Sequence, residues 1–261
     1  MRYKLFNGNC VEVLKQFGSE RIDLTITSPP YDDLRVYNGF QFNYQEVIIE
    51  LYRVTKDGGV VIWVVADRTT NGSESGTSFK QALFAKEIGF NLHDTMIYVK
   101  ENPVPLTHNR YEQSFEYMFV FSKGAPKTFN PILDDCISFG KSINRIVHKK
   151  AIGEIGYATR CRDEITTTKE KKIRINAWSY VVGKGSSSHP APFPIELVQD
   201  HMLSWSNPDD VVLDPMMGSG TTGICAARLR RKFVGIEISE DYFTQTKEQI
   251  ESAFSLKVVA A

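Results

Sequence analysis

The sequence is poor in cysteine and has no long apolar run. Its four cysteines are Cys10, Cys136, Cys161 and Cys225, widely spaced and without a C-x-x-C pair. This spacing argues against a zinc site and a disulfide framework, and it favours a reducing compartment. No stretch reaches the roughly 18 apolar residues of a membrane-spanning helix, and the N-terminal residues carry no secretory signal. We therefore expect a cytoplasmic protein with no metal centre and no membrane partner.

The chain also has no excess of charge of either sign, since 31 basic residues balance 31 acidic ones. The charges are nevertheless unevenly distributed. The stretch from Lys141 to Arg174 holds ten lysines and arginines against four acidic residues. A basic block of this kind on a neutral protein indicates a contact surface for phosphates.

Strand and helix patterns alternate along most of the chain. Strand patterns cover 3–6, 21–27, 60–66, 91–100, 114–124, 210–215 and 232–238, and helix patterns cover 10–17, 43–59, 76–90, 190–206, 219–231 and 240–256. Such alternation predicts an α/β fold with a doubly wound, mostly parallel sheet. In these sheets ligands bind beyond the carboxyl ends of the strands, so the loops at those ends are the candidate site.

One segment interrupts the alternation. Residues 126–177 show no long helical period, and they contain the basic block. We expect them to be an insertion into a single domain that is formed by residues 1–125 and 178–261.

A glycine-rich turn joins the strand at 210–215 to the next helix. In the sequence VLDPMMGSGTTG, Gly218 and Gly220 allow a tight turn and a close approach of a ligand to the backbone. Glu237 ends the following strand, where a carboxylate binds the ribose hydroxyls of an adenosine ligand. Asp214 would repel a pyrophosphate but suits a cationic amino or sulfonium group. The pattern therefore favours S-adenosylmethionine over a dinucleotide, and no lysine follows the glycines as a Walker A site requires.

A second motif, Ser28-Pro29-Pro30-Tyr31, follows the strand at 21–27. Two prolines make a rigid turn whose carbonyl groups are free acceptors. We predict that the Ser28 hydroxyl and the Pro29 carbonyl accept both hydrogens of a planar exocyclic amine. The Tyr31 ring then stacks on a base that has left the duplex. Two acceptors pull the nitrogen toward sp³ geometry and free its lone pair for in-line attack on a sulfonium methyl group.

With the proline motif near the N-terminus and the glycine-rich turn near the C-terminus, the motifs resemble those of the amino DNA methyltransferases, specifically their circularly permuted β class. FNGNCVEVL is similar to the family's opening motif, which contacts the cofactor adenine, with Asn9 where the family usually has Asp. VVADRTTNGSESGTSF is similar to a family segment that would place Asp67 near the site, and HPAPFPIELV is similar to the segment at the methionine end of the cofactor. The resemblance implies a Rossmann-like, seven-stranded sheet with one antiparallel strand, and S-adenosylmethionine as the cofactor.

The motifs and the resemblance together define the expected site residues. The expected catalytic residues are Ser28, Pro29, Pro30 and Tyr31. The expected cofactor-binding residues are Asn9, Cys10, Thr27, His189, Phe193, Pro194, Asp214, Pro215, Met216, Gly218, Ser219, Gly220, Thr221, Thr222 and Glu237.

The implied substrate is double-stranded DNA, with residues 126–177 as the target-recognition region. Candidate DNA contacts are Arg35, Tyr37, Arg110, Lys149, Lys150, Arg160, Arg162, Lys171, Lys172 and Arg174. Serine before the two prolines favours cytosine N4 as the acceptor, and adenine N6 is the alternative. Methylation of RNA or of a glutamine side chain, and a non-catalytic DNA-binding subunit, are further alternatives. A cognate endonuclease of a restriction-modification system and a second copy of the chain remain open as partners.

Overall fold

The structure is a computed structural model that describes residues 2–30, 42–103, 109–148, 160–182 and 194–255, without the side chains of 143–148 and 160–166. The chain divides into two compact units. One comprises Met1–Asn130 together with Asn176–Ala261, and the other comprises Pro131–Ile175. The second unit lies within the segment 126–177 that the sequence marks as an insertion.

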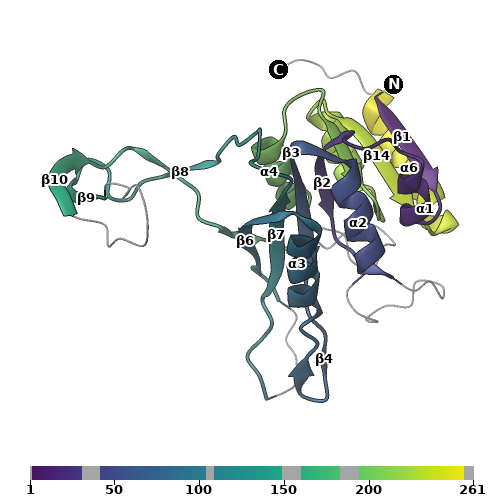
Figure 1. The fold of residues 1–261 in the computed structure, drawn as a ribbon, viewed down its shortest axis with the longest axis horizontal. Coiled ribbons are helices and arrows are strands. Elements are labelled where there is room, and N and C mark those ends of the chain that lie inside the picture. The colour runs from purple at the N-terminus through teal and green to yellow at the C-terminus, as the bar shows by residue number, and fades with distance from the viewer. Residues whose placement is uncertain (1, 31–41, 104–108, 149–159, 183–193, 256–261) are drawn as a thin grey trace. The chain divides into compact units, whose positions relative to one another are not determined.

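The first unit is built on one large sheet (Figure 1). Among the described residues this sheet has eight strands, in the order β1 (Tyr3–Asn7), β14 (Lys232–Glu237), β13 (Val211–Asp214), β2 (Ile22–Thr27), β3 (Thr55–Val65), β7 (Phe115–Ser122), β6 (Asn91–Lys100) and β12 (Ala177–Tyr180). Neighbouring strands are parallel, except that β7 runs antiparallel to both β3 and β6. The predicted α/β fold, with a mostly parallel sheet and one reversed strand, is confirmed.

The sheet has one strand more than the seven that the sequence predicted. The addition is β12, which pairs in parallel with β6 and places Trp178 beside Tyr98. Trp178 and Tyr180 are buried while the residues between and before them are exposed, as in a strand covered on one face. Four residues after an irregular segment are too few to show this alternation clearly in the sequence.

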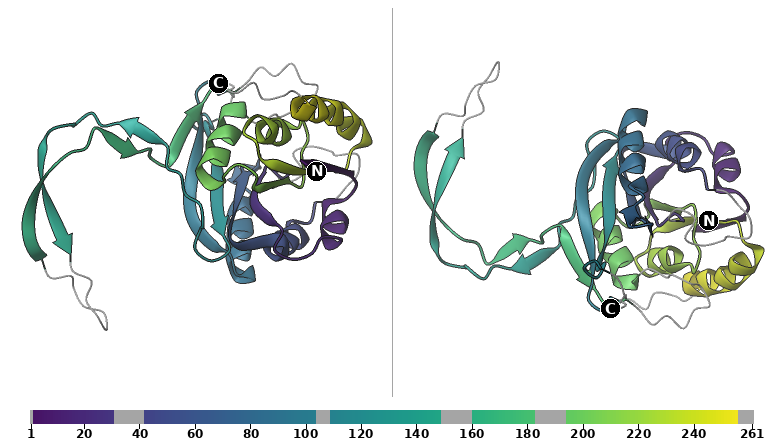
Figure 2. Two further views of the ribbon diagram at one scale, coloured as in Figure 1. Left: turned by 90° about the horizontal axis from the view of Figure 1, so that it is seen from above. Right: turned by 90° about the horizontal axis from the view of Figure 1, so that it is seen from below.

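Among the described residues, six helices cover the two faces of the sheet (Figures 1 and 2). On one face lie α1 (Cys10–Lys15), α2 (Tyr44–Val54) and α3 (Thr77–Ile88). On the other face lie α4 (Ile195–Trp205), α5 (Thr221–Arg228) and α6 (Glu240–Ser255). Within the described residues, no helix is long and apolar enough to span a membrane.

Helix α2 ends earlier than its sequence predicts. We expected Gly58 and Gly59 to terminate it, but both lie in β3 and the helix ends at Val54. The hydroxyl of Thr55 donates to the carbonyl of Leu51 over 2.6 Å, and the Thr55 backbone is already extended. The β-branched side chains of Val54 and Thr55 favour this early change from helix to strand.

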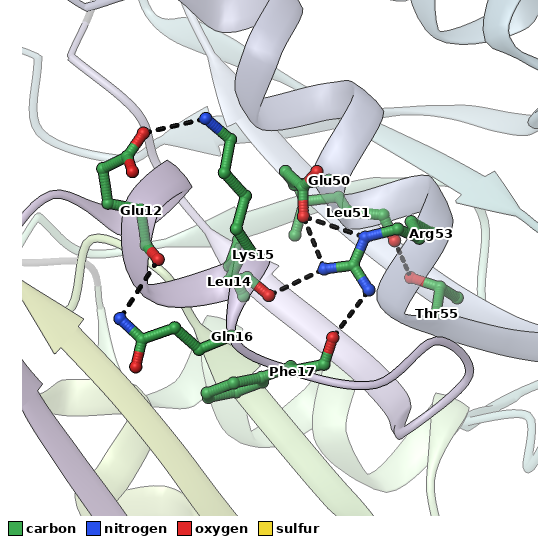
Figure 3. A network of polar contacts seen from close by, with 9 residues as sticks. All are labelled: Glu12, Leu14, Lys15, Gln16, Phe17, Glu50, Leu51, Arg53 and Thr55. Atoms are coloured by element: carbon green, nitrogen blue, oxygen red, sulfur yellow. Dashed lines mark hydrogen bonds and ion pairs between the residues drawn. The ribbon is translucent and has the colours of Figure 1, made fainter.

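Arg53, in the last turn of α2, ties this helix to α1 (Figure 3). Its guanidinium group donates to the carbonyl oxygens of Leu14 and Phe17, each over 2.7 Å, and pairs with Glu50 at 2.5 Å. The two carbonyl groups lie at the carboxyl end of α1 and beyond it, where a helix leaves acceptors without intrahelical partners. One side chain therefore satisfies the end of α1 and fixes it against α2.

The connections of the sheet reverse direction between β13 and β2. From β13 the chain passes through α5 to β14 on one side, and from β2 it passes through α2 to β3 on the other. The two helices lie on opposite faces of the sheet. This is a topological switch point, where the carboxyl ends of two parallel strands open a crevice for a ligand.

Three pairs of short strands complete the described structure. In the first unit, β4 (Thr69–Thr70) and β5 (Ser73–Glu74) form a small hairpin after β3. In the second unit, β8 (Leu133–Asp135) pairs with β11 (Lys171–Ile173), and β9 (Ser142–His148) pairs with β10 (Arg160–Thr167). Both pairs are antiparallel, so the strands described in the second unit form two-stranded ribbons.

Candidate active site

Asp214 ends β13 at the switch point, and its carboxylate is buried. Oδ1 accepts from the Thr27 hydroxyl over 2.9 Å and from the Met216 backbone N–H over 3.2 Å. Oδ2 accepts from the Thr222 hydroxyl over 2.7 Å. The three donors come from β2, from the glycine-rich turn and from α5, so they fix the carboxylate from several directions.

The environment of Asp214 makes it an unusual acid. Burial raises its pKa from 3.8 to about 6, and the nearby charge of Glu237 acts in the same direction. The hydrogen bonds from Thr222, Met216 and Thr27 oppose this effect and lower the pKa. Among the described residues Asp214 has no ion-pair partner, and a buried unpaired carboxylate is costly, so this one is well suited to a ligand that brings positive charge.

Glu237 ends β14, is buried, and holds the glycine-rich turn. Oε2 accepts from the backbone N–H of Gly218 over 2.9 Å, and Oε1 accepts from the backbone N–H of Ser239 over 2.9 Å. Burial raises the pKa of this carboxyl group, and the backbone hydrogen bonds lower it. Glu237 therefore lies at the same edge of the sheet as Asp214, at the end of the neighbouring parallel strand.

The glycine-rich turn packs tightly against α6. Gly220 has φ +75°, and a Cβ atom built there would lie 2.4 Å from Cγ2 of Thr246. The Thr246 hydroxyl also donates to the carbonyl of Gly218 over 2.6 Å. Glycine is required at 220 for both reasons, the left-handed backbone and the close approach of a neighbouring side chain.

The remaining residues of the turn connect it to α5. Ser219 and Thr221 lie with their hydroxyl oxygens 3.1 Å apart, just before and at the first residue of α5. Pro215 is buried and Met216 is half-buried. The structure thus gathers all the residues predicted between 214 and 222 around one turn at the amino end of a helix, where free backbone N–H groups are available.

The loop after β1 lies beside Glu237. The Gly8 N–H and the Asn7 side chain both donate to the carbonyl of Glu237, each over 2.9 Å. Asn9, predicted to accept from an adenine amino group, caps α1 by accepting from the Val11 N–H over 2.9 Å. Burial raises the pKa of the Cys10 thiol to about 11, so this predicted contact is a neutral thiol. The sequence reading did not foresee the capping role of Asn9, although Asn before a helix is a common cap.

The proline motif begins where β2 ends. Thr27 is the last residue of β2, and Ser28, Pro29 and Pro30 follow it directly. Pro29 is buried, whereas Ser28 and Pro30 are half-buried. Because Thr27 is bonded to Asp214, the structure brings the start of this motif to the glycine-rich turn across 187 positions of sequence.

Several predicted residues cannot be placed. Tyr31, Arg35, Tyr37, Lys149, Lys150, His189 and Phe193 lie outside the described residues, as do the side chains of Arg160 and Arg162. Pro194 is described; it is buried and immediately precedes α4.

The described candidate DNA contacts are engaged within the protein to different degrees. Lys171 pairs with Asp135 at 2.5 Å and Arg174 pairs with Asp134 at 3.1 Å, within the ribbon of β8 and β11. Lys172 is exposed. Arg110 pairs with Glu74 at 3.7 Å and also donates to the carbonyl of Gly72, so it contacts the β4–β5 hairpin.

Asp67, which the family resemblance placed near the site, contacts the start of α3. Its carboxylate accepts from the Ser75 hydroxyl and the Ser78 N–H, each over 2.9 Å. The carboxylate thus satisfies one free N–H group at the amino end of the helix. Among the described residues, no group of three or more His, Cys, Asp or Glu side chains is arranged to hold a metal ion.

Known proteins resemble this chain in sequence and in fold. A family model of N6 and N4 methyltransferases, described as DNA methylase, matches residues 22–248. The orphan methyltransferase M.BamHII of Bacillus amyloliquefaciens is 49% identical over 247 residues, covering 91% of this chain and 92% of that protein. The type II methyltransferase M.SmaI of Serratia marcescens is 27% identical, covering 95% and 90%.

Solved structures agree with these sequence matches. The complex of M1.HpyAVI with SAM superposes with a TM-score of 0.60 at 25% identity, covering 95% of this chain and 99% of that one. The cytosine-N4-specific PvuII DNA methyltransferase has a TM-score of 0.68 at 19% identity, covering 98% and 92%, which shows the shared fold. From the family match and the relative at 49% identity, we conclude that the chain belongs to the N6/N4 DNA methylase family, the S-adenosylmethionine-dependent amino methyltransferases of DNA.

Proposed function

We propose that this protein transfers a methyl group from S-adenosylmethionine to the exocyclic amine of a base flipped out of double-stranded DNA, and that the base is cytosine. The observation that carries the proposal is the hydrogen bond between Thr27 and Asp214. It joins the strand that leads into the proline motif to the strand that leads into the glycine-rich turn. A methyl donor and an amine acceptor must meet in one place, and the switch point supplies that place.

The residues at the strand ends suit S-adenosylmethionine. Asp214 offers a buried carboxylate for a cationic group, and Glu237 offers a second one for ribose hydroxyls. Gly218 and Gly220 both have positive φ angles, so the backbone turns tightly at the start of α5, where helix N–H groups face a ligand. Asn9 and Cys10, beside Glu237, remain the proposed contacts to the adenine ring. When bound, the cofactor supplies an electrophilic methyl group on a sulfonium.

The proline motif would prepare the amine for this group. Ser28 Oγ and the Pro29 carbonyl accept its two hydrogens, draw the nitrogen lone pair out of conjugation with the ring, and orient it. Tyr31 would stack on the flipped base. The half-buried Ser28 and buried Pro29 sit on a rigid strand end, which is what accurate positioning of a substrate requires.

Cytosine N4 is proposed over adenine N6 because serine precedes the two prolines. Both bases present an amino group beside a ring nitrogen, so either can meet the two acceptors, and adenine N6 is the second candidate. The non-catalytic subunit is disfavoured because the cofactor turn and the proline motif are both complete. The order of the motifs along the chain supports membership of the circularly permuted β class.

We further propose that residues 126–177 recognise the target sequence. The excess of basic residues between Lys141 and Arg174 supports contact with phosphates. Of the candidate contacts in this segment whose side chains are described, Lys172 is exposed, whereas Lys171 and Arg174 pair with aspartates. Two-stranded antiparallel ribbons are also among the elements that fit a DNA major groove.

The test is to incubate the protein with methyl-labelled S-adenosylmethionine and plasmid DNA, and then to identify labelled nucleosides by mass spectrometry. Label in N4-methylcytosine supports the proposal, and label in N6-methyladenine supports the second candidate. Label in neither nucleoside, from protein that binds both DNA and cofactor, would favour the non-catalytic class. A parallel sample of Ser28→Ala controls for contaminating methyltransferases.

A further inference from the structure

Thr27 occupies a position between the two halves of the site. Its side chain is fully buried, and its hydroxyl donates to Oδ1 of Asp214. Thr27 is the last residue of β2, and Ser28 follows it directly. A substitution at Thr27 can therefore affect both the Asp214 carboxylate at the end of β13 and the proline motif that follows β2.

We infer that Thr27 is a positioning residue that couples the two halves of the active site, by fixing the Asp214 carboxylate from the strand that carries the Ser28-Pro29-Pro30 turn. The inference deepens the proposed function and rests on it. It also revises the expected role of Thr27, since the buried hydroxyl acts through Asp214 and need not touch the cofactor itself.

The strand pairing supports a mechanical link. β13 and β2 are hydrogen-bonded neighbours, with Leu213 opposite Thr25. Beyond this pair the side chains of Asp214 and Thr27 continue the contact between the two strands up to the edge of the sheet. Thr222 holds the other carboxylate oxygen from α5, and the Met216 N–H also donates to Oδ1. A shift of Thr27 would therefore remove one of three donors, and the only side-chain donor to Oδ1.

The chain provides a matched control for Thr27. Thr25 lies two positions earlier on β2, so it points to the same face of the sheet, and it is also fully buried. Within the described structure, however, the Thr25 hydroxyl has no hydrogen-bond partner. Thr25→Val and Thr27→Val thus make the same chemical change at equally buried positions, and only the second removes a bond to Asp214.

The experiment compares the wild-type protein with Thr27→Val, Thr27→Ser and Thr25→Val by calorimetric titration with S-adenosylmethionine between about pH 5 and 8. Loss of a hydrogen bond to a charged group predicts binding weakened about tenfold in Thr27→Val near neutral pH. The pH midpoint of binding should also move upward. The Thr27 bond lowers the pKa of Asp214, so its loss leaves the raising effects of burial and of the Glu237 charge less opposed. Thr27→Ser should restore both values, and Thr25→Val should leave both unchanged.

Transfer rates provide the second readout. At saturating cofactor and DNA, Thr27→Val should still lose about tenfold in kcat because Ser28 is displaced. In the Asp214→Asn background, Thr27→Val should weaken binding much less than it does in the wild type, because the charge that Thr27 orients is already lost, and a general loss of folding would not reproduce this.

Equal affinities and equal pH midpoints for Thr27→Val and Thr25→Val would overturn the inference. So would an undiminished effect of Thr27→Val in the Asp214→Asn background. A wild-type protein that binds the cofactor but methylates no DNA would instead contradict the proposed function, and the binding comparison would still test Thr27.

Discussion

Thr27 and Asp214, 187 positions apart in the sequence, meet through a 2.9 Å hydrogen bond at the carboxyl ends of adjacent parallel strands. Thr27 directly precedes the proline motif, and Asp214 directly precedes the glycine-rich turn. The bond is therefore the structural reason to regard the proline motif and the glycine-rich turn as one site.

Asp214→Asn should weaken S-adenosylmethionine binding by about 10- to 100-fold, because a hydrogen-bonded charge opposite a cation is lost. The amide oxygen can still accept from Thr27 or Thr222, so the fold should be kept. Calorimetric titration measures the affinity, and thermal unfolding serves as the control for folding. Binding of S-adenosylhomocysteine, which lacks the sulfonium charge, should weaken less if the carboxylate faces the sulfonium. An unchanged affinity for S-adenosylmethionine would place the cofactor elsewhere.

Cofactor binding should tighten as the pH rises through about 6, because burial raises the pKa of Asp214 to about 6 and the cation binds its ionised form. The stability of the cofactor-free protein should respond in the opposite sense. Since the folded pKa lies above the ordinary 3.8, Asp214 contributes stability at low pH that is lost as the pH rises to about 6.

Asp214→Asn provides the control for this pH dependence. Titrations and denaturant unfolding at a series of pH values should show both trends in the wild type and a reduced trend in the variant. A variant that keeps the full wild-type pH dependence of binding would assign the titration to another group.

Gly220→Ala should destabilise the protein by about 1–3 kcal/mol more than Gly72→Ala does. Both glycines have similar positive φ angles, +75° and +79°. A Cβ atom at 220 would lie 2.4 Å from Thr246, whereas a Cβ atom at 72 meets nothing within 4 Å. Denaturant unfolding measures the difference, which isolates steric contact from backbone strain. Equal losses would mean that the turn at 220 adjusts freely to a side chain.

Arg53→Met should lower the free energy of unfolding by about 2–4 kcal/mol, because the Phe17 carbonyl and the Glu50 carboxylate lose the guanidinium donor. The Leu14 carbonyl loses the same donor but keeps its bond from the Phe17 N–H. Cofactor affinity should stay near that of the wild type, since Arg53 lies away from the strand-end turns. The control is Lys15→Met, which breaks the exposed pair with Glu12 and should change the free energy of unfolding far less, because solvent screens such a pair. Similar losses in the two variants would contradict the anchoring role of Arg53.

Much of this architecture follows from local sequence patterns. The β-branched run at 60–66 and the apolar runs that end at Thr27 and Asp214 predict buried parallel strands. The structure has a strand at each of these places. In a parallel sheet, the carboxyl ends of the strands lie along one edge. Asp214 and Glu237 could therefore be assigned to that edge from the sequence alone.

Other features depend on contacts between distant segments. The two threonine donors to Asp214 come from β2 and α5, and no local pattern distinguishes Thr27 from Thr25, whose hydroxyl has no partner among the described residues. The pairing of Lys171 with Asp135 depends on the register of β8 and β11, which a short irregular segment does not reveal. Strand β12 and the early end of α2 were missed for a similar reason, because tertiary packing decides between helix, strand and loop where the local preference is weak.

The most direct test of the account separates binding from transfer at its two motifs. Ser28→Ala and Asp214→Asn are each compared with the wild type for cofactor affinity, and for the rate of methyl transfer to DNA at saturating cofactor. We predict that Ser28→Ala binds S-adenosylmethionine like the wild type but transfers the methyl group at least about 100-fold more slowly. Asp214→Asn should instead lose affinity for S-adenosylmethionine. Wild-type transfer by Ser28→Ala would contradict the claim that the proline motif and the glycine-rich turn form one methyl-transfer site.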